Sequence, residues 1–143
     1  MQHRIRAVTT AAAAALGVAV LGACGSSSAT RISSTATVRI NGSEIRPQLV
    51  RCVQVEWYRT IDIGNGDSGA TVVIDLRAEP ISAQSVRIRN LGGFTGMYSE
   101  GDGGEANAGF SGNKFTVSGT ANGFDTAKPV EPATAGFTIV VDC

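Results

Sequence analysis

From Thr37 to the C-terminus, apolar residues recur at every second position, and this period limits the fold more than any other feature of the chain. A period of two places successive side chains on opposite faces of a β-strand. The predicted strands therefore have one apolar and one polar face, as in antiparallel sheets packed on one side. Their apolar members are Val38 and Ile40; Val53, Val55, Trp57, Ile61 and Ile63; Val72, Ile74 and Leu76; Val86 and Ile88; Phe115 and Val117; and Phe137, Ile139, Val141 and Cys143.

Turn-forming residues separate these segments. Asn41-Gly42 is the dipeptide most typical of a two-residue hairpin, and glycines are dense at 64–69, 92–93 and 101–104. Residues 37–143 are therefore predicted to form one all-β extracytoplasmic domain, an antiparallel β-sandwich or irregular two-sheet fold of six to eight short strands. Trp57 is expected in its core and Tyr58 on the polar face, where ordinary exposure is expected and a role in a contact surface is the alternative.

The N-terminal residues have the organisation of an export signal. Two arginines precede an apolar, uncharged run from Ala7 to Leu21, which is too short to span a bilayer. The run ends in a lipobox, Leu21-Gly22-Ala23-Cys24. Residues 1–23 are therefore predicted to be a lipoprotein signal peptide, and Cys24 to become an N-terminus that carries acyl chains such as palmitate. The alternative is an ordinary secretory signal with cleavage near Ala23.

Lipidation of Cys24 predicts the location of the mature protein. A diacylglycerol supplies two acyl chains, which suffice for stable anchoring, so we expect a lipid-anchored protein on the extracytoplasmic face of the cell membrane, in the cell envelope. Residues 24–36 are predicted to be a lipidated, Ser/Thr-rich tether, with O-glycosylation at Thr30, Ser33, Ser34 and Thr35. The 12 basic and 12 acidic residues of the chain balance, so we expect no nucleic-acid partner.

The two remaining cysteines, Cys52 and Cys143, predict one disulfide, because exported proteins sit where disulfides persist. The alternative is a pair of buried free thiols. Cys143 shares the parity of its apolar neighbours, whereas Cys52 has the opposite parity to the apolar residues at 53–63. Either a bulge near Arg51 or a position at the edge of a sheet would reconcile Cys52 with the bridge.

Segments that resemble catalytic or cofactor motifs have simpler interpretations. Residues 64–69 fit G-x-G-x-x-G, but a β-branched strand follows in place of the helix that a dinucleotide site needs, so a hairpin turn is predicted. The same stretch resembles the active-serine segment of a protease, yet the single histidine, His3, leaves with the signal peptide. The acidic loop at 100–105 is predicted to be solvated; the alternative is a weak Ca²⁺ site, but the loop lacks the alternating acidic ligands and the closing glutamate of an EF-hand. We therefore expect no catalytic residue, no metal, no cofactor and no enzymatic activity.

The C-terminal third carries a family resemblance. Residues 115–125 (FTVSGTANGFD) and 137–143 (FTIVVDC) are similar to the F-x-I-x-G-T-A-x-G and F-x-I-x-V-x-C segments of the mycobacterial LpqH-like lipoprotein antigen family. Residues 38–42 and Cys52 also resemble the family's pattern. The resemblance implies a surface-exposed, acylated and O-glycosylated lipoprotein without assigned enzymatic activity. It also implies recognition by host pattern-recognition receptors through the acyl chains, and a role as an adhesin.

Together these observations predict a non-enzymatic, membrane-anchored lipoprotein displayed at the cell surface, acting on a host through its acyl group or as an adhesin. The alternative is a module that binds an envelope lipid or glycan. Such a module needs a cavity between its sheets, for which a domain of this size leaves little volume.

Overall fold

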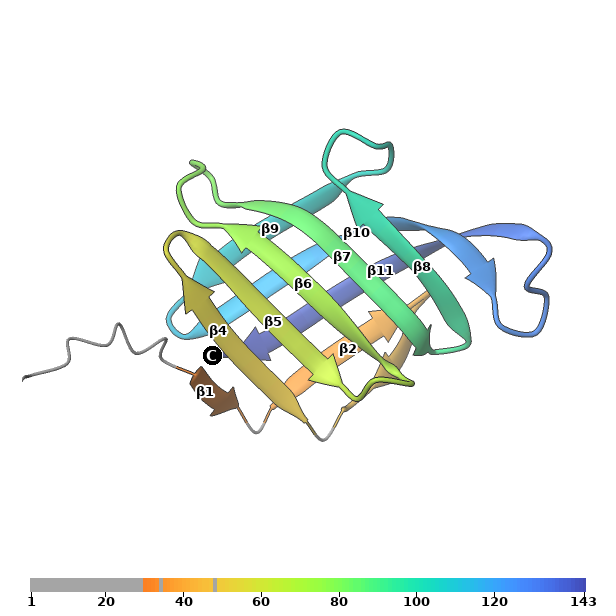
Figure 1. The fold of residues 1–143 in the computed structure, drawn as a ribbon, viewed down its shortest axis with the longest axis horizontal. Coiled ribbons are helices and arrows are strands. Elements are labelled where there is room, and N and C mark those ends of the chain that lie inside the picture. The colour runs from red at the N-terminus through yellow and green to blue at the C-terminus, as the bar shows by residue number, and fades with distance from the viewer. Residues whose placement is uncertain (1–29, 34, 48) are drawn as a thin grey trace, which may run out of the picture.

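The computed structural model describes residues 30–33, 35–47 and 49–143, and of 30–33 only the backbone. Among these residues, no helix has the length and apolarity needed to cross a membrane. The described chain forms eleven β-strands (Figure 1): β1 (Thr30–Ser33), β2 (Ala36–Ile40), β3 (Ser43–Ile45), β4 (Val50–Val55), β5 (Tyr58–Gly64), β6 (Gly69–Asp75), β7 (Ser82–Leu91), β8 (Phe94–Ser99), β9 (Ala106–Ser111), β10 (Lys114–Asp125) and β11 (Pro132–Asp142).

All eleven strands belong to one antiparallel sheet, in the order β1-β4-β5-β6-β7-β8-β10-β11-β2-β3, with β9 also paired to β10. The sheet curls into a half-barrel, so that β4 to β8 cross in front of β10, β11 and β2 (Figure 1). The predicted all-β, antiparallel class is confirmed. The prediction of two separate sheets with six to eight strands is wrong, because the hydrogen-bonded ladder continues from one half of the curl into the other.

The long strand β10 joins the two halves of the curl, because it lies between β8 and β11 in the sheet. Its C-terminal part, Asn122–Asp125, pairs with β8, and its N-terminal part, Lys114–Gly119, pairs with β9. Gly123 lies opposite Gly96 in this ladder, and a Cβ on Gly123 would overlap the backbone of Thr95. Glycine is therefore required where the sheet turns from one half to the other, as at the corner of a barrel.

The apolar core fills the space between the two halves of the curled sheet. Apart from Val53, Val55 and Trp57, most of the apolar positions that the alternation predicted to face inward supply its side chains, and no polar or charged residue is buried among the described residues. The buried residues are Ala36, Val38, Ile40, Val50, Cys52, Ile61, Ile63, Ala70, Val72, Ile74, Ala83, Val86, Ile88, Leu91, Phe94, Tyr98, Phe115, Val117, Ala121, Ala135, Phe137, Ile139 and Val141.

Residues 53–63 differ from the single alternating strand that the sequence predicted. A turn at Glu56-Trp57 divides them, and Val55 pairs with Tyr58 across it. The turn reverses the parity, so Cys52 faces inward from β4 and pairs with the inward-facing Ile61 of β5. Neither a bulge near Arg51 nor an edge position is needed, because β4 lies between β1 and β5 without a register shift.

Trp57 lies in this turn and is 45% exposed, so its prediction as a core residue is wrong. The sequence gives no glycine or asparagine to mark the turn; instead Glu56 adopts a positive φ of 53°. Tyr58 faces solvent, as predicted.

The other predicted turns are confirmed. Asn41-Gly42 joins β2 to β3, with φ values of 48° and 83° that suit the favoured hairpin turn. The glycine-rich stretch after β5 leads directly into strand β6, and Asn65 N donates to Ser68 O across the turn.

Part of the predicted tether is a strand. Thr30–Ser33 pairs with β4, with Thr30 opposite Val53 and Ser33 opposite Val50. Backbone pairing with an edge needs no apolar side chains, which is why a hydroxyl-rich composition did not predict it.

Candidate functional site

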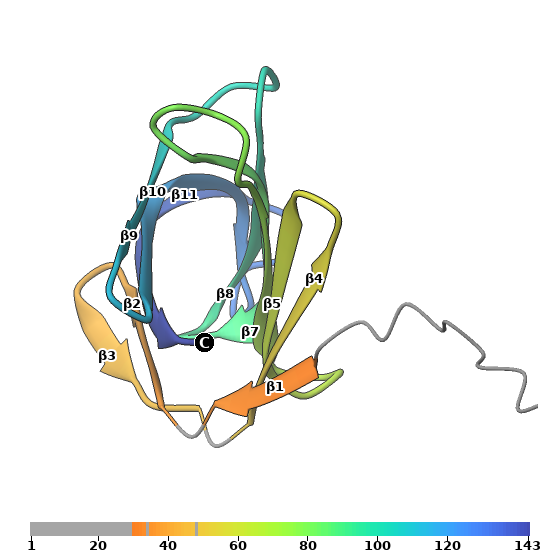
Figure 2. The ribbon, with the colours of Figure 1, turned by 90° about the vertical axis from the view of Figure 1, so that its left-hand side faces the viewer.

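One end of the half-barrel gathers the features that bear on function, and we call it the disulfide end (Figure 2). The start of β1, the β4–β5 turn, the β6–β7 connection, the β9–β10 turn and the C-terminus meet here. Leu76 N donates to Trp57 O at 2.9 Å, which joins the β6–β7 connection to the β4–β5 turn. Cys143 N donates to Asn113 O at 3.0 Å, which joins the C-terminus to the β9–β10 turn.

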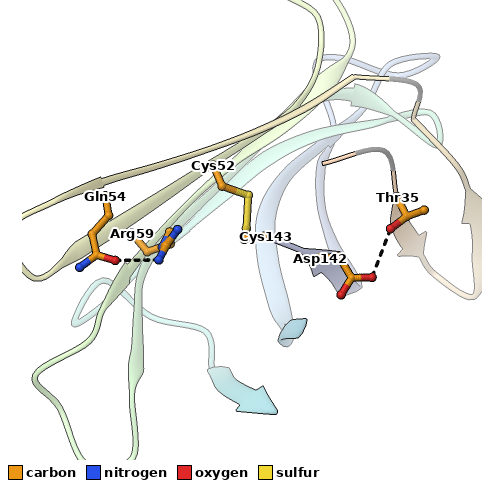
Figure 3. Close-up of a disulfide and its surroundings, with 6 residues drawn as sticks. All are labelled: Thr35, Cys52, Gln54, Arg59, Asp142 and Cys143. Carbon is orange, nitrogen blue, oxygen red and sulfur yellow. Dashed lines mark hydrogen bonds between the residues drawn. A yellow bond between two sulfur atoms is a disulfide. The ribbon is translucent and has the colours of Figure 1, made fainter. Parts of the chain in front are cut away.

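The predicted bridge between Cys52 and Cys143 is present, with a Cα–Cα distance of 5.9 Å (Figure 3). It connects β4 to the residue after β11, and these strands are not neighbours in the sheet order. The disulfide therefore closes the open side of the curl. Beside it, Thr35 Oγ1 donates to Asp142 Oδ2 at 3.2 Å, which also holds the start of β2 against the end of β11.

A cation and two aromatic rings lie next to the bridge. Arg59 Nη2 donates to Gln54 Oε1 at 2.6 Å, and the Arg59 guanidinium carbon is 5.5 Å from the centroid of the Phe115 ring. Phe115 is buried, whereas Phe110, whose ring centroid is 4.4 Å from that of Phe115, is exposed. Phe110 thus continues the core out to the surface at the disulfide end.

Arg77 holds a second aromatic group on the other side of this end. Its guanidinium carbon lies 5.3 Å from the Trp57 ring centroid and 5.5 Å from that of Tyr58. Asp75 fixes it, because Arg77 Nε donates to Oδ1 at 3.1 Å and Nη2 to Oδ2 at 2.8 Å. These hydrogen bonds lower the pKa of Asp75 and raise that of Arg77. The result is a pre-arranged surface of two aromatic rings and a cation.

The remaining predicted site residues are placed as follows. Cys24 and Ser34 lie outside the described residues, and for Thr30 and Ser33 only the backbone, in β1, is described. Thr35 is exposed, and its hydroxyl contacts Asp142 as above. The acidic loop at 100–105 is exposed along its length, and no group of three or more His, Cys, Asp or Glu gathers for a metal in the described part of the chain.

The outer face of β2, β10 and β11 carries a separate open groove of about 380 Å³. A neighbouring hollow of about 300 Å³ shares Arg39 and Thr138 with it. Glu44 accepts hydrogen bonds from Arg39 at 2.8 Å and from Arg46 at 2.9 Å, and these lower the pKa of Glu44. The groove is lined by Arg39, Asn41, Gly42, Ser118, Gly119, Gly136, Phe137 and Thr138.

Sequence reasoning missed Arg77, Phe110 and Gly136. Arg77 and Phe110 stand in segments without a recognisable motif, and only the three-dimensional arrangement brings them to the disulfide end. Gly136 had a signal that could have found it, since a glycine inside an apolar alternating strand can mark a place where a ligand approaches the backbone.

The comparison with known proteins decides the family. Residues 29–143 match the Mycobacterium 19 kDa lipoprotein antigen family. The chain belongs to this family. The resemblance predicted from its C-terminal segments is thereby confirmed, and membership supports a cell-envelope lipoprotein.

Named relatives agree with this assignment. A protein of Mycobacterium indicus pranii, named as a lipoprotein, is 58% identical over 135 residues, which cover 94% of this chain and 97% of that protein. Lipoprotein LppE of Mycobacterium tuberculosis is 36% identical over 138 residues, or 96% of this chain and 98% of LppE. Lipoprotein LpqH of Mycobacterium avium is 35% identical over 95 residues, or 66% of this chain and 58% of LpqH.

Proposed function

We propose that this protein is a non-enzymatic surface lipoprotein, anchored in the extracytoplasmic face of the cell membrane by acyl chains on Cys24. It acts on a host as an antigen, through the acyl group or as an adhesin, and a host pattern-recognition receptor is its partner. The observation that carries the proposal is membership of the lipoprotein antigen family over residues 29–143. The lipobox that ends at Cys24 supplies the attachment point.

Several side chains of the types that carry catalysis are engaged in structural contacts, which supports a non-enzymatic role for the domain. Both cysteines of the described chain are consumed by the disulfide. The carboxylates of Glu44, Asp62, Asp75 and Asp142 each lie within 4.0 Å of an arginine or lysine nitrogen, at distances from 2.8 to 3.7 Å. These carboxylates are thus engaged in surface ion pairs, each of which contributes little to stability.

The anchor is tested with Cys24→Ser. Wild-type protein is expected to enter the detergent phase on partitioning and to show an acyl mass by intact-mass spectrometry, whereas Cys24→Ser stays in the aqueous phase. A Cys24→Ser protein that still partitions into detergent refutes the lipid site.

The role of the acyl group is tested on receptor-bearing host cells. Acylated protein is expected to signal, and the Cys24→Ser form, with the same folded domain, is expected to be silent. Full signalling by Cys24→Ser contradicts action through the acyl group. Cell adhesion that survives in Cys24→Ser assigns the adhesin role to the domain itself.

O-glycosylation at Thr30, Ser33, Ser34 and Thr35 is part of the same proposal. These hydroxyls lie close to the predicted anchor in the sequence, and Thr35 is exposed. Intact-mass spectrometry of the native protein is expected to show added hexose that is lost when the four residues are changed to alanine. If the added hexose mass persists in that variant, these acceptors are excluded.

A glycan-binding module is the second candidate, and the groove on β2, β10 and β11 favours it. The core side chains fill the space between the halves of the sheet, so a ligand is better placed on this outer face. Gly136 opens the groove: its φ is ordinary, and a Cβ there would meet nothing within 4 Å. Hydroxyl and guanidinium donors from Ser118, Thr138 and Arg39 suit a sugar. Binding of envelope polysaccharide that is lost in Gly136→Thr supports this function, and equal binding by Gly136→Thr contradicts it.

A further inference from the structure

Four large hydrophobic side chains are exposed at the disulfide end, three of them on one hairpin and the fourth on β9. Val55, Trp57, Tyr58 and Phe110 are exposed by 58%, 45%, 36% and 55%. The first three belong to the β4–β5 hairpin, and Phe110 reaches the same end through the contacts of Phe115 with Arg59. Clustered exposed apolar side chains mark a surface that meets something other than water.

The path of the chain brings the acyl anchor to the same end. Thr30 starts β1 opposite Val53, two residues before Val55. Only residues 25–29 separate Thr30 from Cys24, and an extended chain of that length spans at most about 20 Å. An acylated Cys24 therefore holds a bilayer surface within reach of Val55, Trp57 and Phe110.

We propose that the disulfide end docks on the membrane surface, with Val55, Trp57 and Phe110 in the interfacial layer and Tyr58 and Arg77 at the level of the lipid headgroups. This inference rests on the proposed acylation of Cys24. Trp and Tyr concentrate at membrane–water interfaces because their rings are apolar and their edges polar. Arg77 already lies against both rings, and its guanidinium can meet a lipid phosphate while its stem stays on apolar surface.

Anchoring makes weak contacts sufficient. Once Cys24 is in the bilayer, docking of the domain is intramolecular, and the effective concentration of the membrane at the disulfide end is high. Because β1 pairs with β4, only residues 25–29 separate the described sheet from the acylated Cys24, so the domain lies on the membrane with a defined orientation.

The orientation determines which surface faces outward. At the opposite end, Thr126 N donates to Gly93 O at 2.9 Å, which joins the β10–β11 connection to the β7–β8 turn. The Asn41-Gly42 turn lies there as well, since a Cβ on Gly92 would come within 3.0 Å of Ile40. Val130, in the β10–β11 connection, is 90% exposed. This end is the part of the domain presented away from the cell.

Trp57 is the single tryptophan of the chain, so its fluorescence reports docking directly. Acylated mature protein is placed in phosphatidylcholine vesicles, with and without lipids brominated at shallow acyl positions. The Trp57 emission is expected to shift to the blue and to be quenched by the brominated lipids. Zwitterionic vesicles are used so that charge attraction alone does not produce the effect.

Two measurements separate anchoring from docking. Intact mass and flotation with the vesicles report the acyl anchor, and Cys24→Ser, which is expected to stay behind, supplies the emission of the undocked domain. Wild-type protein that fails to float refutes the proposed anchor. Wild-type protein that floats with the emission of Cys24→Ser, unquenched, overturns docking. A blue shift that follows protein density and is insensitive to bromine assigns the surface to a second copy of the chain, which also overturns docking.

Matched surface variants complete the test. Val55→Glu and Phe110→Glu are expected to float as wild type does but to lose most of the quenching, because a charge is costly in the apolar layer. Val130→Glu makes the same change at the opposite end and is expected to leave quenching unchanged. Circular dichroism is used to check that all three variants fold. Equal quenching in all of them contradicts the proposed surface.

Discussion

Cys52 and Cys143 join two strands that lie apart in the order of the sheet, β4 and β11. Hydrogen bonding runs from β4 through β8 and β10 to β11, and the disulfide returns from β11 to β4 on the open side. The half-barrel is thus closed by backbone hydrogen bonds on one side and by a covalent bond on the other.

Removal of this bridge is expected to destabilise the domain strongly. Its sequence separation is 91 residues, for which the chain-entropy model gives a contribution of about 4–5 kcal/mol to the free energy of unfolding. Cys52→Ser/Cys143→Ser, made in the soluble Cys24→Ser background, should melt well below its parent. Equal melting temperatures of the parent with and without reductant contradict the prediction.

Trp57 and Phe94 should respond very differently to truncation. Phe94 is 1% exposed, and Phe94→Ala is expected to cost about 3–5 kcal/mol of unfolding free energy. Trp57→Ala removes an exposed ring and its contact with Arg77, which is worth about 0.5–1 kcal/mol at such sites. Denaturant titration of both variants, followed by circular dichroism, measures the difference. A loss at Trp57 as large as that at Phe94 places the indole in the core.

The sequence predicted the inward-facing residues of the strands well, because a sheet with one buried face imposes the period of two directly. It predicted the Asn41-Gly42 hairpin for a similar local reason, since few dipeptides accept two positive φ values. The Glu56-Trp57 turn lacked such residues. Because this one turn was not predicted, Cys52 was assigned the parity of the polar face and Trp57 was placed in the core. In the structure Cys52 is buried and Trp57 is exposed.

The closure of the sheet could not be predicted from local pattern. It depends on β10 pairing with β8 on one edge and with β11 on the other, and each of these ladders has the same alternation as any other. The residues of the disulfide end could not be predicted from local pattern either. Val55, Trp57, Arg77 and Phe110 come from three separate hairpin regions, and only the curl of the sheet brings them to one end.

Gly136 and Gly123 should change the stability of the domain in opposite directions when each is replaced by alanine. Gly136→Ala adds a Cβ where nothing lies within 4 Å and φ is ordinary, so it is expected to stabilise the domain by about 0.4–1 kcal/mol by restricting the unfolded chain. Gly123→Ala forces a Cβ against the backbone of Thr95 and is expected to destabilise it. Thermal unfolding of the two variants is the measurement. A destabilised Gly136→Ala shows that the groove needs glycine for structural reasons.

The Asp75–Arg77 pair should give Trp57 a dependence on acid. Hydrogen bonds from Arg77 lower the pKa of Asp75 below its ordinary value of 3.8. A carboxyl with a lowered folded-state pKa contributes stability that is present above the unfolded-state pKa and is lost as pH falls through the folded-state pKa. Protonation also releases Arg77 from its fixed place over the Trp57 ring, so the Trp57 emission is expected to change with a midpoint below pH 3.8.

The soluble Cys24→Ser protein suits this titration, with circular dichroism followed in parallel to show that the sheet persists. Asp75→Asn keeps the shape of the side chain but cannot ionise, and it leaves the carboxyl of Glu56 beside Trp57 in place. The emission of Asp75→Asn is therefore expected to stay level over the range in which the parent changes. A midpoint at or above pH 3.8, or the same transition in Asp75→Asn, means that Asp75 does not hold Arg77 over the ring.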